Sequence, residues 1–201
     1  MLSDSEIRAD LARLKDIAAA HRAANAELAV HEQQIGDQTL RVFSHIPANL
    51  ASLYALGGQA PDLPFLVYRE QRYSFAETLD LTARLGRVLL TRYGIGRGDR
   101  VAICARNSPE WCIAYMAITS IGAIVVPMNS WWQGPELEYG LRDSGARLVF
   151  ADPERSAQLQ PYLQALNVSL IAINPEPAQA DWPEFHSLLS DAEPLSRGEL
   201  D

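Results

Sequence analysis

Four short apolar runs recur along the second half of the chain, and stretches able to form helices separate them. The runs are RVAICA, AIVVP, RLVFA and VSLIAI, at residues 100–105, 123–127, 147–151 and 168–173. They are rich in Val and Ile and lack polar alternation, which is typical of strands buried on both faces. Helices of about ten to fifteen residues between such strands imply right-handed crossovers. The sequence therefore predicts an α/β fold, a mainly parallel sheet with helices on both faces.

Start signals for three helices lie between these runs. Ser108 is placed to cap a helix that has Pro109 at its first position and extends to about residue 121. The second helix opens at residues 134–136 with Gly-Pro-Glu, and the third extends from Pro153 to about residue 166. These signals support the crossover interpretation.

The amino-terminal part predicts an amphipathic helix over residues 4 to about 29. Ser3 and Glu6 have the spacing of a capping box, and Ile7, Leu11, Leu14 and Ala18 follow at helical spacing. We expect this helix to dock on the main body or on a partner chain. Its apolar residues are not bulky enough, and its polar face not basic enough, to favour a membrane-surface helix.

Less regular structure is expected between this helix and the first apolar run. We predict a strand over TLRVF, a helix from Ala48 to Leu56, a hairpin from FLVY and QRYS, and a helix opened by a Ser74–Glu77 capping box. The domain interpretation is an extension over 1–35, an α/β domain over 36–192, and a polar linker over 193–201 with no internal support.

Charge and cysteine content limit the partners and the compartment. The 17 Lys and Arg against 25 Asp and Glu give a net charge of −8, with one Lys and dispersed Arg. Nucleic acid is therefore a poor partner. Two cysteines cannot build a disulfide framework, and the charged amino terminus has no apolar signal region, so the cytoplasm is expected. The uncharged run 113–128 would span roughly 24 Å as a helix, short of the roughly 30 Å hydrocarbon core, so no transmembrane segment is predicted.

The familiar short motifs do not assign a catalytic or metal-binding residue. GIGRGDR, at 94–100, follows a predicted helix and enters a strand, whereas a dinucleotide fingerprint needs the reverse order. HEQQI, at 31–35, lacks the second His of a zinc-protease helix. Cys104 and Cys112 are interpreted as core residues. No G-x-S-x-G or G-x-x-x-x-G-K-[ST] motif occurs in the sequence.

One segment gathers unusual residues where α/β proteins bind ligands. NSWWQGPELEYGLRDSG, at 129–145, leaves the carboxyl end of a predicted parallel strand. Trp131 and Trp132 are adjacent, so they cannot share one face in a regular conformation. Either one fills the core while the other covers a loop, or one faces a ligand or an interface.

The order of these segments resembles a known family. FLVYREQRYSFAE, followed by YGIGRGDRVAICARNSPEWCIAYMAITSIGAIVVPMNSWWQGPELEYGLRDSGARLVFAD, resembles the amino-terminal part of the adenylate-forming superfamily. This superfamily includes acyl-CoA synthetases, aryl and coumarate ligases, luciferases and nonribosomal adenylation domains. The resemblance covers roughly residues 60 to 155, and the double Trp followed by Pro-Glu-Leu is most similar to the bacterial fatty acyl-CoA synthetase-like branch.

The resemblance implies a two-step carboxylic acid–CoA ligation that uses ATP, Mg²⁺ and coenzyme A. The family's phosphate loop ending in Pro-Lys-Gly and its catalytic Lys domain have no counterpart in these 201 residues, so no catalytic residue is carried over. PLSRGELD, at 194–201, resembles the linker that leads into that loop. By position, Ser130, Trp131 and Trp132 and the turn from Asp152 to Arg155 match segments that line the coenzyme A nucleotide site.

Two functional hypotheses follow from this sequence. The first is the amino-terminal fragment of a carboxylic acid–CoA ligase, inactive alone, with a small-molecule carboxylic acid as substrate of the full-length form. The second is a non-catalytic α/β binding or interaction module from a truncated gene. In either case, apolar surface left uncovered by missing neighbours predicts self-association.

Overall fold

The structure is a computed structural model that describes residues 3–25, 28–177, 181–196 and 199. The chain divides into two units, Met1–Ala48 and Asn49–Asp201. The boundary predicted after residue 35 lies 13 residues before this division, inside a turn of the first unit.

The first unit begins with helix α1, Asp4–Ala24. The predicted capping box is present, because the Ser3 backbone N–H donates to Glu6 Oε2 at 2.7 Å and the Ser3 side chain accepts from the Glu6 backbone. The helix ends before the predicted limit at about residue 29, because Asn25 takes an extended conformation and the chain turns toward a strand. No residue of α1 is buried.

A two-stranded antiparallel hairpin completes the described part of the first unit. Strand β1, Val30–Ile35, pairs with strand β2, Gln38–Phe43, through a turn at Gly36, which has a φ of +60°. The predicted strand over TLRVF is confirmed. Strand β1 was not predicted, because HEQQ is polar at four successive positions and gives no apolar alternation.

The second unit opens with short elements that lead into a long helix. The predicted hairpin and the Ser74–Glu77 capping box are both confirmed. The elements are α2 (Leu50–Ala55), the 3₁₀ helix η2 (Leu56–Gln59), β3 (Pro64–Tyr68), β4 (Gln71–Ser74) and α3 (Phe75–Arg92).

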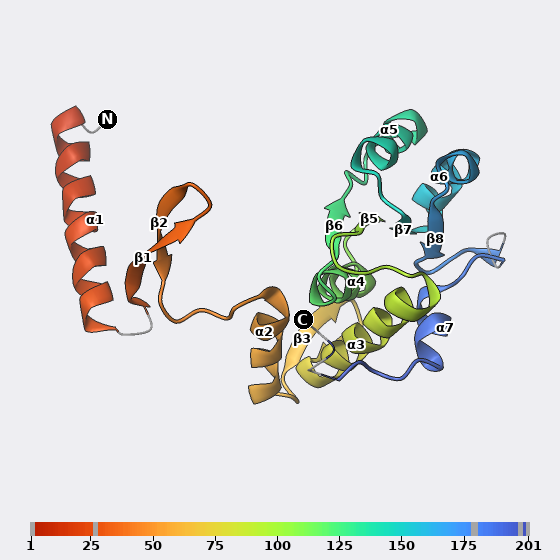
Figure 1. Ribbon diagram of the computed structural model, residues 1–201, viewed down its shortest axis with the longest axis horizontal. Coiled ribbons are helices and arrows are strands. Elements are labelled where there is room, and N and C mark those ends of the chain that lie inside the picture. Colours follow the sequence, from red (N-terminus) through yellow and green to blue (C-terminus); the bar gives the residue numbers. More distant parts are fainter. Residues whose placement is uncertain (1–2, 26–27, 178–180, 197–198, 200–201) are drawn as a thin grey trace. The chain divides into compact units, whose positions relative to one another are not determined.

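A four-stranded parallel sheet forms the centre of the second unit, with the strand order β6-β5-β7-β8. Helices α4, α5 and α6 connect successive strands, and Figure 1 shows α5 and α6 on the side of the sheet opposite to α3, α4 and α7. The predicted α/β fold is confirmed. The elements are β5 (Arg100–Cys104), α4 (Pro109–Ser120), β6 (Ile124–Pro127), α5 (Gly134–Ser144), β7 (Leu148–Ala151), α6 (Pro153–Leu166), β8 (Ser169–Ala172) and α7 (Phe185–Ser190).

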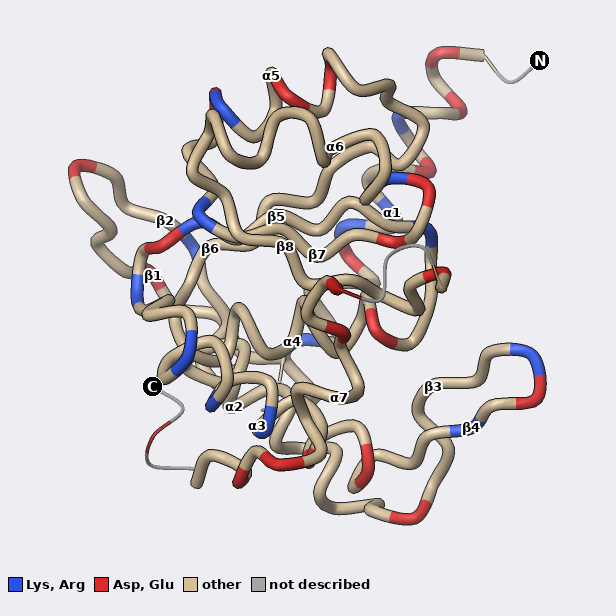
Figure 2. Tube along the Cα trace, turned by 90° about the vertical axis from the view of Figure 1, so that its right-hand side faces the viewer, with Lys and Arg blue, Asp and Glu red and all other residues tan. Residues whose placement is uncertain are grey.

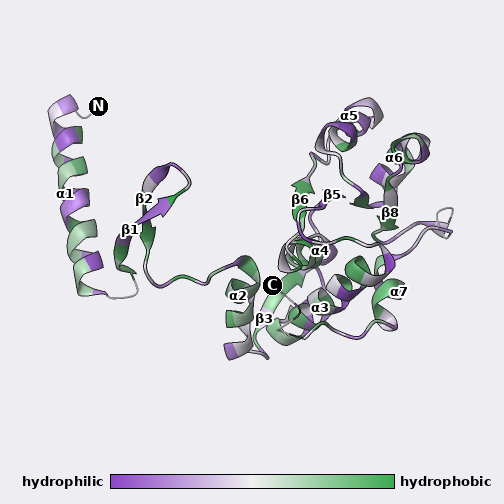
Figure 3. Ribbon diagram, viewed as in Figure 1, coloured by the Kyte–Doolittle hydropathy of each residue, from purple (hydrophilic) through white to green (hydrophobic). Residues whose placement is uncertain are grey.

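Alternate strand residues feed two separate cores, one on each face of the sheet. Val101 and Ile103 of β5 pack with α3, α4 and α7, whereas Ala102 and Cys104 pack with α5 and α6. Figure 3 accordingly shows apolar colour over β6, β8 and α4. Both cores require apolar residues at successive strand positions, which explains the unbroken apolar runs in the sequence.

The described residues of the segment predicted as a linker, 193–196 and 199, pack on α3. Leu195 is buried, and its backbone N–H donates to the Ala83 carbonyl at 3.3 Å. Arg87 forms an ion pair with Glu199 at 2.9 Å. The expectation that this segment has no internal support is therefore wrong for its described residues, and its role as a linker stays a prediction.

Charged residues of both signs follow one another along the trace of the second unit (Figure 2). None of the described helices combines the length and the apolar character that a bilayer crossing requires.

Candidate functional site

The loops after β5 and β7 border a groove at the carboxyl edge of the sheet. Its volume is about 490 Å³, and we call it the carboxyl-edge groove. Residues that line it come from the β3–β4 hairpin, from these two loops and from the end of β8; among them are Tyr68, Arg106, Asp152, Glu154, Ile173 and Asn174. Open α/β sheets bind ligands at this edge.

Trp131 and Trp132 point in different directions, as their adjacency requires. Trp131 is 70% exposed, and the Arg106 guanidinium carbon lies 4.4 Å from the centre of its ring. Trp132 is partly buried against the core formed by α5 and α6. One indole therefore supports the core, and the other presents an apolar surface and an adjacent positive charge to solvent.

Arg155 ties the loop that carries Trp131 to the start of α6. Its side chain is only 3% exposed, and Nε donates to the Ser130 carbonyl at 2.7 Å. The same guanidinium reaches Asp152 at 3.3 Å and Glu154 at 2.8 Å. Because these contacts engage its guanidinium, we infer that Arg155 holds the loop in position.

Asp152 links a third loop to this arrangement. It caps α6, with its Oδ1 accepting from the Arg155 backbone at 3.1 Å, while Oδ2 accepts from the Arg106 backbone at 2.9 Å. The loops after β5, β6 and β7 are thus joined through Asp152 and Arg155. Ser130 contributes its backbone carbonyl, which accepts the hydrogen bond from Arg155.

Sequence analysis did not identify Arg106 as a site residue. It lies two residues after the end of β5, and Asp152 lies one residue after the end of β7, so its place after a parallel strand was the available signal. Its contact with Trp131 depends on the β6–α5 loop folding back, which no local pattern encodes.

Cys104 lies at the end of β5 but is unsuited to nucleophilic chemistry. Burial raises the pKa of its thiol to about 12, and the Asp152 carboxylate adds to this increase. The pKa of Cys112 is also raised, first by burial. Both thiols therefore stay protonated at neutral pH. The predicted core role is confirmed for Cys104, whereas Cys112 is only partly buried and belongs to neither core.

A polar contact between a buried carboxylate and an exposed histidine joins two helices outside the groove lining. Glu110 of α4 is buried and its Oε1 lies 3.0 Å from His186 Nε2 of α7. Burial opposes the ionised form of Glu110, but hydrogen bonds from His186 and Ser108 outweigh it and lower its pKa. The same bond raises the pKa of His186. We interpret the pair as a structural link between the two helices.

The carboxyl-edge groove is lined by the Arg106 guanidinium and by the carboxylates of Asp152 and Glu154. The predicted site residues Ser130, Trp131, Trp132 and Arg155 are not part of this lining, but Arg106 connects the groove to the exposed indole of Trp131. Within the described ranges, no group of three or more His, Cys, Asp or Glu side chains could hold a metal ion. No described residue is therefore assigned as a metal ligand.

Residues 55–197 match the family of AMP-binding enzymes. The chain belongs to this family. The chain is 30% identical to 4-coumarate–CoA ligase 2 of Oryza sativa subsp. japonica over 166 residues, which are 75% of this chain and 28% of that protein. It is 32% identical to the long-chain-fatty-acid–CoA ligase FadD13 of Mycobacterium tuberculosis (strain ATCC 25618 / H37Rv) over 117 residues, 58% of this chain and 22% of that protein.

The fold agrees with solved structures of ligases. A benzoate CoA ligase from Burkholderia xenovorans LB400 superposes with a TM-score of 0.66 and 20% sequence identity, covering 74% of this chain and 29% of that one. In all three comparisons, this chain spans less than a third of the length of its relative.

Proposed function

We propose that this chain is the amino-terminal part of an ATP-dependent carboxylic acid–CoA ligase, with the carboxyl-edge groove and the adjacent Trp131 on the coenzyme A side. The observation that carries the proposal is the exposed indole of Trp131, held beside Arg106 at the ligand-binding edge of a sheet that lies inside the AMP-binding match. The two CoA ligases among the relatives support the reaction class. The similarity of the double Trp and the following Pro-Glu-Leu to the bacterial fatty acyl-CoA synthetase-like branch, together with the 32% identity to a long-chain-fatty-acid–CoA ligase, supports a role in fatty acid metabolism.

In such a ligase, ATP supplies the adenylyl group that activates the carboxylate, with Mg²⁺ neutralising phosphate charge, and coenzyme A supplies the thiol that receives the acyl group. No residue of this chain is assigned to ATP, to Mg²⁺ or to the reacting carboxylate. We therefore propose that its residues bind and orient, and that the 201-residue chain alone does not activate a carboxylic acid.

The residues present fit the nucleotide end of coenzyme A. An adenine ring can stack on the Trp131 indole, and stacking of a base on an aromatic side chain is worth about 1–3 kcal/mol. The Arg106 guanidinium covers one face of the Trp131 ring, which leaves the other face for the base, and it can attract a phosphate group. Ser130 and Arg155 contribute by fixing the loop, and Trp132 contributes by anchoring it in the core.

The cytoplasm remains the compartment we propose for this protein. Cys104 and Cys112 are free thiols, which agrees with a reducing environment.

Calorimetric titration with coenzyme A tests the binding part of the proposal. Trp131→Ala should weaken binding by about fivefold to 150-fold, which corresponds to the loss of about 1–3 kcal/mol of stacking. Tyr139→Ala is the matched control, because Tyr139 is another exposed aromatic side chain, on helix α5. Equal affinity of wild type and Trp131→Ala would contradict the assignment.

Pyrophosphate exchange tests the reaction part. The purified chain, given ATP, Mg²⁺ and a panel of aliphatic and aromatic carboxylic acids, should show no acid-dependent exchange of labelled pyrophosphate into ATP. Robust exchange would mean that this chain holds an active site of its own. A chain that neither exchanges nor binds coenzyme A would favour the non-catalytic module.

A further inference from the structure

Helix α1 lies outside the segment that matches the AMP-binding family, which begins at residue 55. Within the first unit, it carries a stripe of exposed apolar side chains. Ile7, Leu11, Leu14 and Ile17 are each between 44% and 60% exposed. We propose that α1 is a dimerisation helix, which pairs in parallel with α1 of a second copy of this chain.

The spacing of the stripe is that of a coiled-coil seam. Ile7, Leu11, Leu14, Ala18 and His21 follow one another at intervals of four, three, four and three residues. This is the a/d pattern of a heptad repeat, which keeps one face of a helix against its partner. Three turns carry large apolar residues, and Ile17 widens the stripe beside the seam.

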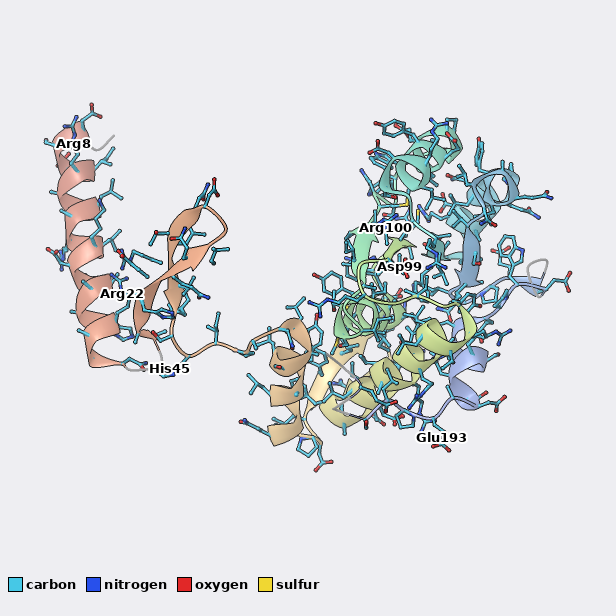
Figure 4. The ribbon with its side chains drawn as sticks, in the orientation of Figure 1. Arg8, Arg22, His45, Asp99, Arg100 and Glu193 are labelled. Atoms are coloured by element: carbon cyan, nitrogen blue, oxygen red, sulfur yellow. The ribbon has the colours of Figure 1, made fainter. Side chains whose placement is uncertain are left out.

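The charges that flank the seam select the parallel arrangement. Arg8, Lys15 and Arg22 all occupy the e position on one side, and Asp10 occupies the g position on the other. Figure 4 labels Arg8 near the amino end of α1 and Arg22 near its carboxyl end. In a parallel pair, g contacts the e position of the next heptad, so Asp10 faces Lys15 of the second copy, twice by symmetry.

An antiparallel pair would be electrostatically unfavourable. It would bring e positions together: with Leu11 of one copy opposite Leu14 of the other, Arg8 faces Lys15 of the second copy, twice by symmetry. Like charges in such contacts oppose association. The complementary arrangement is available only when the helices run in the same direction.

The charge composition of α1 argues against a lipid surface as the partner that covers its apolar stripe. The helix carries four acidic residues, at positions 4, 6, 10 and 16, and four basic residues, at positions 8, 13, 15 and 22. Membrane-surface helices instead concentrate basic residues on the polar face to attract anionic lipid. Because the charges of α1 balance, an anionic lipid surface does not attract it. A second helix of the same composition can pair with it without net charge repulsion.

Light scattering after size exclusion tests the proposal on the whole chain. At roughly 100 μM, the wild type should have twice the 22.2 kDa mass of one chain. Leu11→Asp should return the mass to that of one chain. Ala9→Asp places the same charge on the opposite side of the helix and should leave the dimer intact, while circular dichroism checks that the variants keep their helices.

A charge exchange tests the direction of pairing. Asp10→Lys and Lys15→Asp should each raise the dissociation constant about tenfold, and the double variant should restore it. Asp16→Lys, on the outer face, is the control for the change in charge. A wild type of single-chain mass, a dimer that survives Leu11→Asp, or no recovery in the double variant would each overturn the proposal. Binding of the wild type to phosphatidylcholine–phosphatidylglycerol vesicles, lost in Leu11→Asp, would also overturn it.

Discussion

Replacing Arg155 by Met should destabilise the second unit more than any exposed arginine replacement would. Met fills a similar length of the buried site, so the change isolates the polar contacts of the guanidinium. Those contacts are the hydrogen bond to the Ser130 carbonyl at 2.7 Å and the ion pairs with Asp152 and Glu154.

The size of the stability loss follows from how far each contact partner is shielded from solvent. The charge-assisted bond to the Ser130 carbonyl is worth about 1.5–3 kcal/mol, since Arg155 is only 3% exposed. Asp152 is 16% exposed and adds about 1 kcal/mol, whereas the exposed Glu154 adds almost nothing. The expected loss of about 3 kcal/mol lowers the melting temperature by about 6–12 °C for a unit of this size.

Urea and thermal unfolding, followed by circular dichroism, measure this loss. Arg142→Met is the matched control, because Arg142 is 61% exposed in its pair with Glu138 and should cost no more than about 0.5 kcal/mol. Arg155→Met within about 0.5 kcal/mol of wild type would refute the assignment of Arg155 as the link between the loops.

Three further predictions concern single positions. Gly145→Ala should cost about 1 kcal/mol in urea unfolding, because Gly145 ends α5 with a φ of +63°; a neutral result would contradict this. His186→Ala should cost more stability at pH 6 than at pH 9. The Glu110 contact raises the His186 pKa, so its contribution is full below the ordinary value of 6.5 and is lost as pH rises through the raised value; a cost independent of pH would contradict the pairing. Cys104 should resist iodoacetamide at neutral pH until the chain is unfolded, and rapid labelling of the native thiol would be inconsistent with its raised pKa.

The sheet was predictable because strands that are buried on both faces appear in the sequence as unbroken apolar runs. All four strands β5–β8 fall within the apolar runs, since most residues of β5, β7 and β8 face one of the two cores. The edge strand β6 is less buried, and its Ile124 is 50% exposed. The helix starts were equally predictable, because Ser3, Ser74 and Ser108 act locally through their own side chains.

Other elements escaped prediction because they depend on contacts distant in sequence. Strand β1 has exposed polar residues and is defined by its pairing with β2. Leu195 becomes buried only because α3 offers Gly86, where its side chain approaches closely. In the site, the exposed Trp was foreseeable, but Arg106 stacks on Trp131 from a loop 25 positions earlier in the chain.

The most direct test of the proposed coenzyme A side is the indole N–H region of the ¹⁵N NMR spectrum during titration with coenzyme A. The chain has four Trp, and signals can be assigned by single Trp→Phe variants. Coenzyme A at about 1 mM should shift the Trp131 signal. It should leave the Trp111 signal in place, because Trp111 stacks on Tyr115 and packs against the core formed with α3, α4 and α7. An unmoved Trp131 signal, or equal shifts of both, would contradict the account.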